Sequence, residues 1–141
     1  MAGQILIVDD NAAVRSLLTL LVRRAGFEVD TAEDGVEALE KLRDGTYWIV
    51  LLDLMMPRMN GYEVVEQLRR IEDRPAVIAI TAAIPSAPDL DPAVVHAVVR
   101  KPFDIELLGA VIVDCARQFA AQRGSTSRPG DGVTPLNGSV N

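Results

Sequence analysis

Four short apolar runs in this chain end in polar side chains that could do chemistry together. The runs and their polar ends are residues 5–8 with Asp9 and Asp10, residues 49–52 with Asp53, residues 77–80 with Thr81, and residues 97–99 with Arg100 and Lys101. Carboxylates are ligands for hard divalent cations, whereas hydroxyl and ammonium groups donate to phosphoryl oxygens. Gathered in one place, these side chains would suit a divalent cation and a phosphoryl group.

The apolar runs predict strands that bring these side chains together. They are rich in Val and Ile, which is typical of strands buried on both faces of a parallel sheet. In an open parallel α/β sheet, ligands bind at the carboxyl ends of the strands. We therefore expect three carboxylates, one hydroxyl and one ammonium group at the same edge of the sheet.

Helical patterns separate the strands. The residues predicted to cap helices are Asn11, Asp34, Asn60 and Asp104, and Gly26 and Gly45 are predicted to end the first two. Apolar residues recur at helical spacing after each cap, so Leu17, Val36 and Leu107 are among those expected to point inward. Residues 27–31 predict one further short strand. Strand and helix alternate five times, which calls for parallel strands joined by right-handed crossovers.

Two stretches depart from this alternation. Residues 82–92 contain three prolines, which forbid a long helix there. We expect a loop and then a short helix from about Pro92, a residue suited to the first turn. Residues 124–141 are rich in Gly, Ser, Thr, Pro and Asn and predict a disordered tail or the start of a linker. The expected folded domain is residues 1–123.

Composition limits the classes of partner. A chain of 141 residues with 49% hydrophobic residues is large enough for one packed domain. The net charge of -6 argues against direct binding to nucleic acid or to an anionic membrane. No apolar run is long enough to span a bilayer, and no secretory signal is recognised. The single cysteine, Cys115, permits no internal disulfide, so the expected location is the cytoplasm.

The polar ends together resemble the receiver domain of two-component response regulators, the CheY-like family. The residues that carry the resemblance are Asp9-Asp10, Asp53 with the following Leu54-Met55-Met56-Pro57, Asn60-Gly61, Thr81-Ala82 and Lys101-Pro102-Phe103. The resemblance extends from Gln4 to about Arg123. It implies an α/β fold of flavodoxin-like type, a doubly wound five-stranded parallel sheet in the order 2-1-3-4-5. The prolines from Pro85 to Pro92 fall where the family has its fourth helix, so this helix is expected to be irregular or short.

The resemblance also implies a magnesium-dependent phosphoacceptor site. Magnesium prefers hard oxygen ligands and retains several waters. Asp10, Asp53 and the backbone carbonyl of Met55 would bind Mg²⁺, and Asp9 would hold a metal-bound water. Without a cation, carboxylates placed so close together would raise one another's pKa.

In the same resemblance, Asp53 is the phosphoacceptor. Thr81 and Lys101 would contact the phosphoryl oxygens, and the peptide bond before Pro102 would be cis. The donor would be a histidine kinase or a histidine phosphotransfer protein, and the output a change of protein partner. The domain would assist its own phosphorylation and dephosphorylation and would not otherwise be an enzyme.

The sequence departs from the family pattern at positions that concern signalling. Receivers usually carry an aromatic residue three positions before the lysine, and Val98 stands there, so the usual coupling between aromatic residue and threonine is not expected. Met55 and Ala83, the variable positions beside the phosphoryl site, lack groups that could orient water. Two other classes stay open. One is a phosphorylation-independent interaction module on the same fold.

The second alternative is a phosphohydrolase of the haloacid-dehalogenase type. That class needs a second Asp two residues after Asp9, where this chain has Asn11, and it would leave Asp53 without a role. Taken singly, Thr81 could be an ordinary strand residue and Lys101 a solvated lysine, neither with a functional role. An acid at the end of an apolar strand is harder to dismiss, since its burial is costly without a partner.

Overall fold

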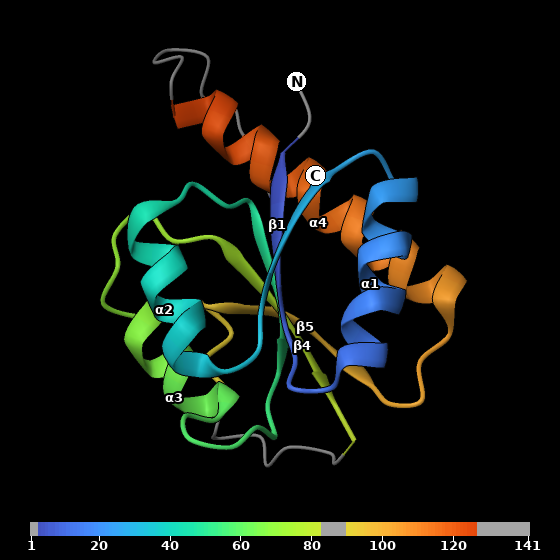
Figure 1. Ribbon diagram of the computed structural model, residues 1–141. Coiled ribbons are helices and arrows are strands. Elements are labelled where there is room, and N and C mark those ends of the chain that lie inside the picture. Colours follow the sequence, from blue (N-terminus) through green and yellow to red (C-terminus); the bar gives the residue numbers. More distant parts are fainter. Residues whose placement is uncertain (1–2, 83–89, 127–141) are drawn as a thin grey trace.

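The computed structural model describes residues 3–82 and 90–126, which form a five-stranded parallel sheet covered by helices on both faces (Figure 1). The strands are β1 (Gln4–Val8), β2 (Glu28–Ala32), β3 (Ile49–Asp53), β4 (Ala76–Thr81) and β5 (Val95–Arg100). Their order is β2-β1-β3-β4-β5, with every pair parallel. This confirms the predicted doubly wound α/β class and strand order.

Within the described residues, four helices pack against the sheet. They are α1 (Ala12–Arg24), α2 (Gly35–Asp44), α3 (Gly61–Leu68) and α4 (Ile105–Thr126). Figure 1 shows α2 and α3 on one face of the sheet, and α1 and α4 on the other. Two separate hydrophobic clusters fill the two faces, with Leu6 and Leu52 in one and Ile7 and Leu51 in the other. The central strand β3 is buried along its whole length because both faces are covered.

The predicted helix caps are confirmed. The side chains of Asn11, Asp34 and Asn60 each accept a hydrogen bond from a backbone N–H in the first turn of α1, α2 and α3. Asp104 does the same for Leu107 at the start of α4. Each cap satisfies donors that the helix itself leaves without partners. Helix α1 begins close after the polar end of β1, whereas residues 54–60 separate the end of β3 from α3.

Several expectations about packing were wrong. Leu17, Val36 and Leu107 lie at the surface, with 40%, 43% and 58% of their area exposed. The apolar stripes of α1, α2 and α4 are narrower than the periodicity suggested, because a helix that lies on a sheet buries only the side that faces the sheet, whereas the stripe of α3 is buried as expected. The stripe of α1 reduces to Leu18 and Val22 as its fully buried members.

The segment between β4 and β5 also differs from expectation. Pro92 does not begin a short helix: within the described residues, the amides of Val94 and Val95 donate to the carbonyl of Asp91 and form a turn. Strand β5 then starts at Val95, two residues earlier than the apolar run suggested. Residues 83–89, where the loop and the Ala83 position were expected, lie outside the described residues.

The C-terminal boundary remains a prediction. Helix α4 continues to Thr126, three residues beyond the expected end of the domain at residue 123. The expected tail lies almost wholly outside the described residues. Among the described helices, none combines the length and apolarity that crossing a membrane requires.

A polar network ties the edge strand β2 to α2. Asp30 accepts hydrogen bonds from the Tyr47 hydroxyl at 2.7 Å, from Lys41 Nζ at 3.0 Å and from the Thr31 amide at 2.9 Å. Burial acts to raise the pKa of Asp30, but these donors outweigh it and hold the pKa below the ordinary 3.8. Burial and the Asp30 carboxylate raise the pKa of Tyr47, so its hydroxyl remains a donor.

Replacing Asp30 by Asn should therefore make stability less dependent on acid. A carboxylate whose pKa is lowered on folding stabilises the fold above its unfolded pKa and loses that contribution as the pH falls through the folded value. Both partners in the Lys41 pair are about one third exposed, so we expect a contribution below about 1 kcal/mol. The measurement is the difference in melting midpoint between the two proteins, which should shrink below about pH 4. A difference in melting midpoint that stays constant with pH would contradict this prediction.

Candidate functional site

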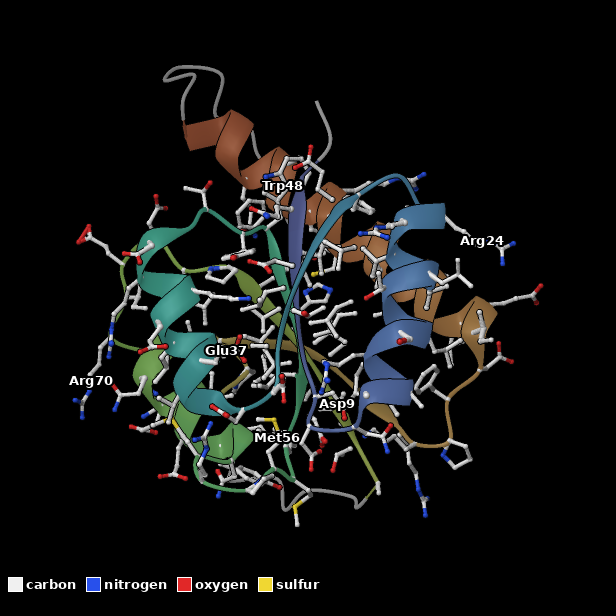
Figure 2. All side chains as sticks on the ribbon, in the orientation of Figure 1. Asp9, Arg24, Glu37, Trp48, Met56 and Arg70 are labelled. Carbon is white, nitrogen blue, oxygen red and sulfur yellow. The ribbon has the colours of Figure 1, made fainter. Side chains whose placement is uncertain are left out.

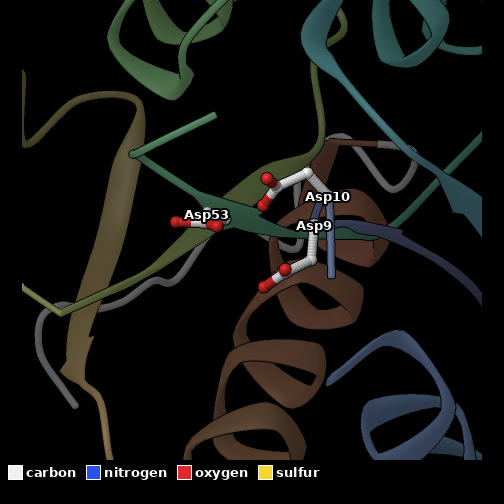
Figure 3. A group of neighbouring side chains, drawn as sticks. All are labelled: Asp9, Asp10 and Asp53. Carbon is white, nitrogen blue, oxygen red and sulfur yellow. The ribbon is translucent and has the colours of Figure 1, made fainter. Parts of the chain in front are cut away.

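Three aspartates meet at the carboxyl edge of the sheet, at the ends of β1 and β3. Val8, the last residue of β1, pairs in register with Leu52, so Asp9 follows β1 at the level where Asp53 ends β3. One carboxylate oxygen from each of Asp9, Asp10 and Asp53 lies within 4.8 Å of the others (Figure 3). The predicted gathering of carboxylates is therefore present.

Two of these carboxylates are buried. Asp9 is 1% exposed and Asp53 is 4% exposed, whereas Asp10 is exposed to solvent. Taking a carboxylate out of water is costly unless donors or cations compensate. Local backbone amides supply part of this: Asn11 N–H donates to Asp9 Oδ1 at 2.9 Å, and Met55 N–H donates to Asp53 Oδ1 at 3.0 Å.

Lys101 supplies the positive charge. Its Nζ lies 3.0 Å from Asp9 Oδ2 and 3.4 Å from Asp53 Oδ2, so one ammonium group contacts both buried carboxylates. The lysine follows β5 directly, and its amide donates to the carbonyl of Thr81 at 2.8 Å. The Lys101–Pro102 peptide bond is cis. Two strand ends and the loop after β5 thus converge on one ion pair.

The electrostatics of the site favour an added cation. Burial raises the pKa of Asp53, and the Asp9 charge raises it further, while the Met55 amide and Lys101 oppose the shift. Burial alone would lower the pKa of Lys101, but its bonds to Asp9 and Asp53 outweigh this and raise it. Within the described residues, the cluster of three carboxylates forms ion pairs with one ammonium group, that of Lys101, which contacts Asp9 and Asp53. Hard oxygen donors with excess negative charge fit a small divalent cation.

Thr81 lies at the neighbouring strand end. It is the last residue of β4 and is 1% exposed. The register pairs Ile80 with Asp53, which puts Thr81 one position beyond the acidic strand end. A hydroxyl here is within the same edge of the sheet as the carboxylates, as the sequence pattern indicated.

The side chains of Met55 and Val98 are both exposed to solvent. The Met55 side chain is 60% exposed, and only its backbone is tied to the site through Asp53. Val98 lies on β5, pairs in register with Ala79 and is 46% exposed. Its side chain is short and half exposed where the family resemblance implies an aromatic ring.

Sequence reasoning missed two cations near the cluster. Arg15 on α1 donates from Nη1 to the backbone carbonyl of Asp9 at 2.8 Å. Arg58, in the loop between β3 and α3, pairs with the buried Asp34 at the start of α2. Arg15 lies one helical turn after the cap Asn11, and this spacing could have predicted that its side chain reaches back to the end of β1. Arg58 is 24 residues from Asp34, and no spacing rule joins them.

Comparisons with known proteins agree on one family. The family model described as the response regulator receiver domain matches residues 5–113. A curated relative, the uncharacterized transcriptional regulatory protein YkoG of Bacillus subtilis, is 38% identical over 82% of this chain and 52% of its own. The CpxR homolog of Haemophilus influenzae, a transcriptional regulatory protein, is 43% identical over 57% of this chain and 34% of its own. The chain thus spans about a third to a half of these relatives.

Solved structures show the same arrangement. The response regulator protein TrrA of Thermotoga maritima, solved in complex with Mg²⁺-BeF, is 34% identical, with a TM-score of 0.73 over 80% of this chain and 98% of its own. A CheY-like receiver domain protein of Methanospirillum hungatei is 24% identical, with a TM-score of 0.79 over 86% of this chain and 99% of its own. The second likeness concerns the fold alone.

Proposed function

Because this chain belongs to the response regulator receiver family of two-component signalling, we propose that it accepts a phosphoryl group on Asp53. The family match over residues 5–113 includes every residue of the acidic cluster and Lys101. Receivers are signalling domains, and the phosphorylated form would bind protein partners differently from the free form. The phosphoacceptor role and the metal are our proposals for this chain.

One observation carries the proposal. Lys101 Nζ contacts two buried carboxylates, at 3.0 Å from Asp9 and 3.4 Å from Asp53. A structural ion pair would need one carboxylate for one lysine. The second buried carboxylate leaves a surplus of negative charge, which is unfavourable for folding and supports a role in binding charged ligands.

The donor set supports magnesium at this edge. Asp10 and Asp53 would bind the ion through carboxylate oxygens, the Met55 backbone carbonyl would add a third oxygen, and Asp9 would hold a metal-bound water. When bound, magnesium supplies positive charge that neutralises the carboxylates and the phosphoryl oxygens. Asp10 is the exposed member, so it offers an entry point for the ion.

The transfer itself requires in-line attack by the Asp53 carboxylate. One carboxylate oxygen forms a bond to phosphorus while the bond from phosphorus to the donor's nitrogen or oxygen breaks, and the leaving group keeps the electron pair and takes a proton from solvent. Lys101 would turn from the carboxylates to the phosphoryl oxygens as a point charge, and Thr81 would donate its hydroxyl to another oxygen. Hydrolysis of the acyl phosphate by water restores Asp53.

The partners follow from the family. A histidine kinase or histidine phosphotransfer protein is the proposed donor, and the downstream partner is a protein of unknown identity. The expectation that nucleic acid is no partner is not supported. The curated relatives are named transcriptional regulatory proteins and are two to three times as long as the part that matches. The whole protein could therefore act on DNA through a part that this chain does not include.

Phosphorylation of the purified chain by a small-molecule phosphodonor tests the proposal. With magnesium present, intact mass should show one added phosphoryl group per chain, and the Asp53→Asn variant should show none. Removal of magnesium by a chelator should abolish the wild-type reaction. A phosphohydrolase that uses Asp9 would instead release phosphate from the donor in the Asp53→Asn variant as well. Equal labelling of the Asn variant would show that Asp53 is not the acceptor.

Val98 keeps a second candidate function open, an interaction module that works without phosphorylation. Its side chain is short and 46% exposed where receivers usually carry an aromatic switch residue. This candidate predicts no incorporation of phosphate under the same conditions, or incorporation without any change in partner affinity.

A further inference from the structure

Arg58 has a backbone conformation that is unusual for its residue type. It lies in the loop from Leu54 to Asn60 that joins β3 to α3, and its φ is 65°. Among the described residues it is the one non-glycine residue with a positive φ. This left-handed conformation is unfavourable for a residue with a Cβ, so contacts elsewhere must hold it.

The compensating contact is an ion pair with Asp34. Asp34 is 5% exposed, and its Oδ1 caps α2 by accepting the Glu37 amide at 2.9 Å. Its other oxygen, Oδ2, pairs with the Arg58 guanidinium. Among the described residues, Arg58 is the cation that forms an ion pair with Asp34. The Arg58 side chain is 68% exposed, so the pair compensates the buried Asp34 carboxylate from the solvent side.

The loop also packs closely against the first turn of α2 beside this ion pair. A Cβ built on Gly35 would lie 2.6 Å from the Met59 carbonyl oxygen and 2.9 Å from its Cβ. Met59 of the loop therefore lies against the backbone of Gly35, which prevents the loop from moving toward α2. The ion pair between Arg58 and Asp34 opposes movement of the loop away from α2.

The held loop leads directly to the acidic cluster. Met55, three residues before Arg58, donates its amide to Asp53 Oδ1 at 3.0 Å. The strand that leads into Asp34 lies on the other side of the cluster: the carbonyl of Ala32, the last residue of β2, accepts the Asp9 amide at 3.2 Å. Asp34 thus lies two residues after a backbone contact to Asp9, and it pairs with the loop that follows Asp53.

We propose that Arg58 is a positioning residue: through its ion pair with Asp34 it holds the loop so that the Met55 backbone faces the acidic cluster and favours magnesium binding. This inference rests on the proposed function of the site. Arg58 touches neither the carboxylates of the cluster nor the phosphoryl position. It acts by fixing the direction of a backbone oxygen, which a mobile loop would leave variable.

Four single variants of the full chain and the double variant Arg58→Ala with Asp34→Asn test this inference. Arg58→Ala and Asp34→Asn each remove the ion pair, and Asn retains the ability to cap α2. Arg58→Lys restores a positive charge. Arg70→Ala is the matched control, since Arg70 is an exposed arginine that points outward from the surface near the end of α3 (Figure 2). Thermal melts first establish that each variant is folded.

Two measurements then decide the outcome. In metal-free protein, amide exchange at residues 55–59 should be faster in Arg58→Ala and Asp34→Asn and unchanged in the control. By calorimetry, both variants should bind Mg²⁺ about tenfold more weakly, the range expected when a group that orients metal ligands is lost. The double variant should be no worse than either alone, because one interaction is removed twice. Arg58→Lys should recover most of the affinity.

Unchanged exchange and unchanged Mg²⁺ affinity in folded Arg58→Ala would overturn the inference. So would equal losses in Arg70→Ala, which would indicate a general effect of net charge. If the wild-type chain neither binds Mg²⁺ nor takes up phosphate, the proposed function fails. Exchange in the metal-free proteins would still show whether the ion pair fixes the loop, so the two failures are distinguishable.

Discussion

Replacing Asp10 by Ala should abolish magnesium binding while leaving the metal-free fold intact. The Asp10 carboxylate is exposed, so its removal breaks little packing, yet it lies within 4.8 Å of the oxygens of Asp9 and Asp53. Its loss relieves repulsion among three like charges, and the metal-free melting midpoint should stay the same or rise. Affinity for Mg²⁺ should fall by more than about 100-fold, beyond the loss expected for an outer partner of a ligand.

Thermal melts with and without magnesium measure both effects at once. Wild-type protein should gain stability as magnesium is added, since a ligand that binds only the folded state raises the midpoint. The Asp10→Ala variant should show no such gain and no phosphorylation by a small phosphodonor. Asp44→Ala, at the exposed end of α2, is the control for loss of one surface aspartate. Retention of the magnesium shift in Asp10→Ala would remove Asp10 from the metal site.

Replacing Gly61 by Ala should damage both stability and the site. A Cβ at this position would lie 2.5 Å from the Asp53 carbonyl oxygen and 2.6 Å from Leu54 Cα, both of them backbone atoms. The first turn of α3 must then move away from the end of β3, and it would break the Gly61 N–H bond to the Leu54 carbonyl at 3.1 Å. We expect a loss of about 2–3 kcal/mol, typical of overpacking where backbone must shift.

Gly109 provides the matched comparison for this prediction. A Cβ there would meet only Leu21 Cδ1, at an ordinary contact distance of 3.7 Å, in the interior of α4. Gly109→Ala should stabilise the protein by about 0.5–1 kcal/mol because alanine is the better helix former. Denaturant unfolding of both variants checks the opposite signs. A Gly61→Ala protein as stable as wild type would show that α3 is loosely seated on β3.

The cluster of acidic residues could be predicted because it depends only on which strands belong to one parallel sheet. Once the runs ending at Asp9, Asp53 and Thr81 are strands of one parallel sheet, their ends must meet, whatever the details of side-chain packing. The caps Asn11 and Asn60 were equally predictable, since a cap is a local interaction between residues three apart. Sheet order came from the family resemblance, because strand patterns alone do not fix which strands are neighbours.

The errors have a different origin. Whether Leu17 or Leu107 is buried depends on how far each helix stands from the sheet and on its rotation, which periodicity does not specify. Pro92 is compatible with both a helix start and a turn, and the bonds to the Asp91 carbonyl decide between them. The Arg58–Asp34 pair joins two loops through tertiary contact. No local sequence pattern predicts such a tertiary contact.

Trp48, the only tryptophan, precedes β3 at the amino edge of the sheet. Its ring stacks on Phe119 of α4 with centroids 5.6 Å apart, and Gly3 packs against its face. Asp53 lies five residues further along the chain, roughly 16 Å away in extended conformation, and Figure 2 shows Trp48 at the opposite end of the sheet from Asp9. Its fluorescence should therefore report the docking of α4 and remain steady while the acidic edge is titrated. One optical signal can follow unfolding while calorimetry follows binding in the same sample.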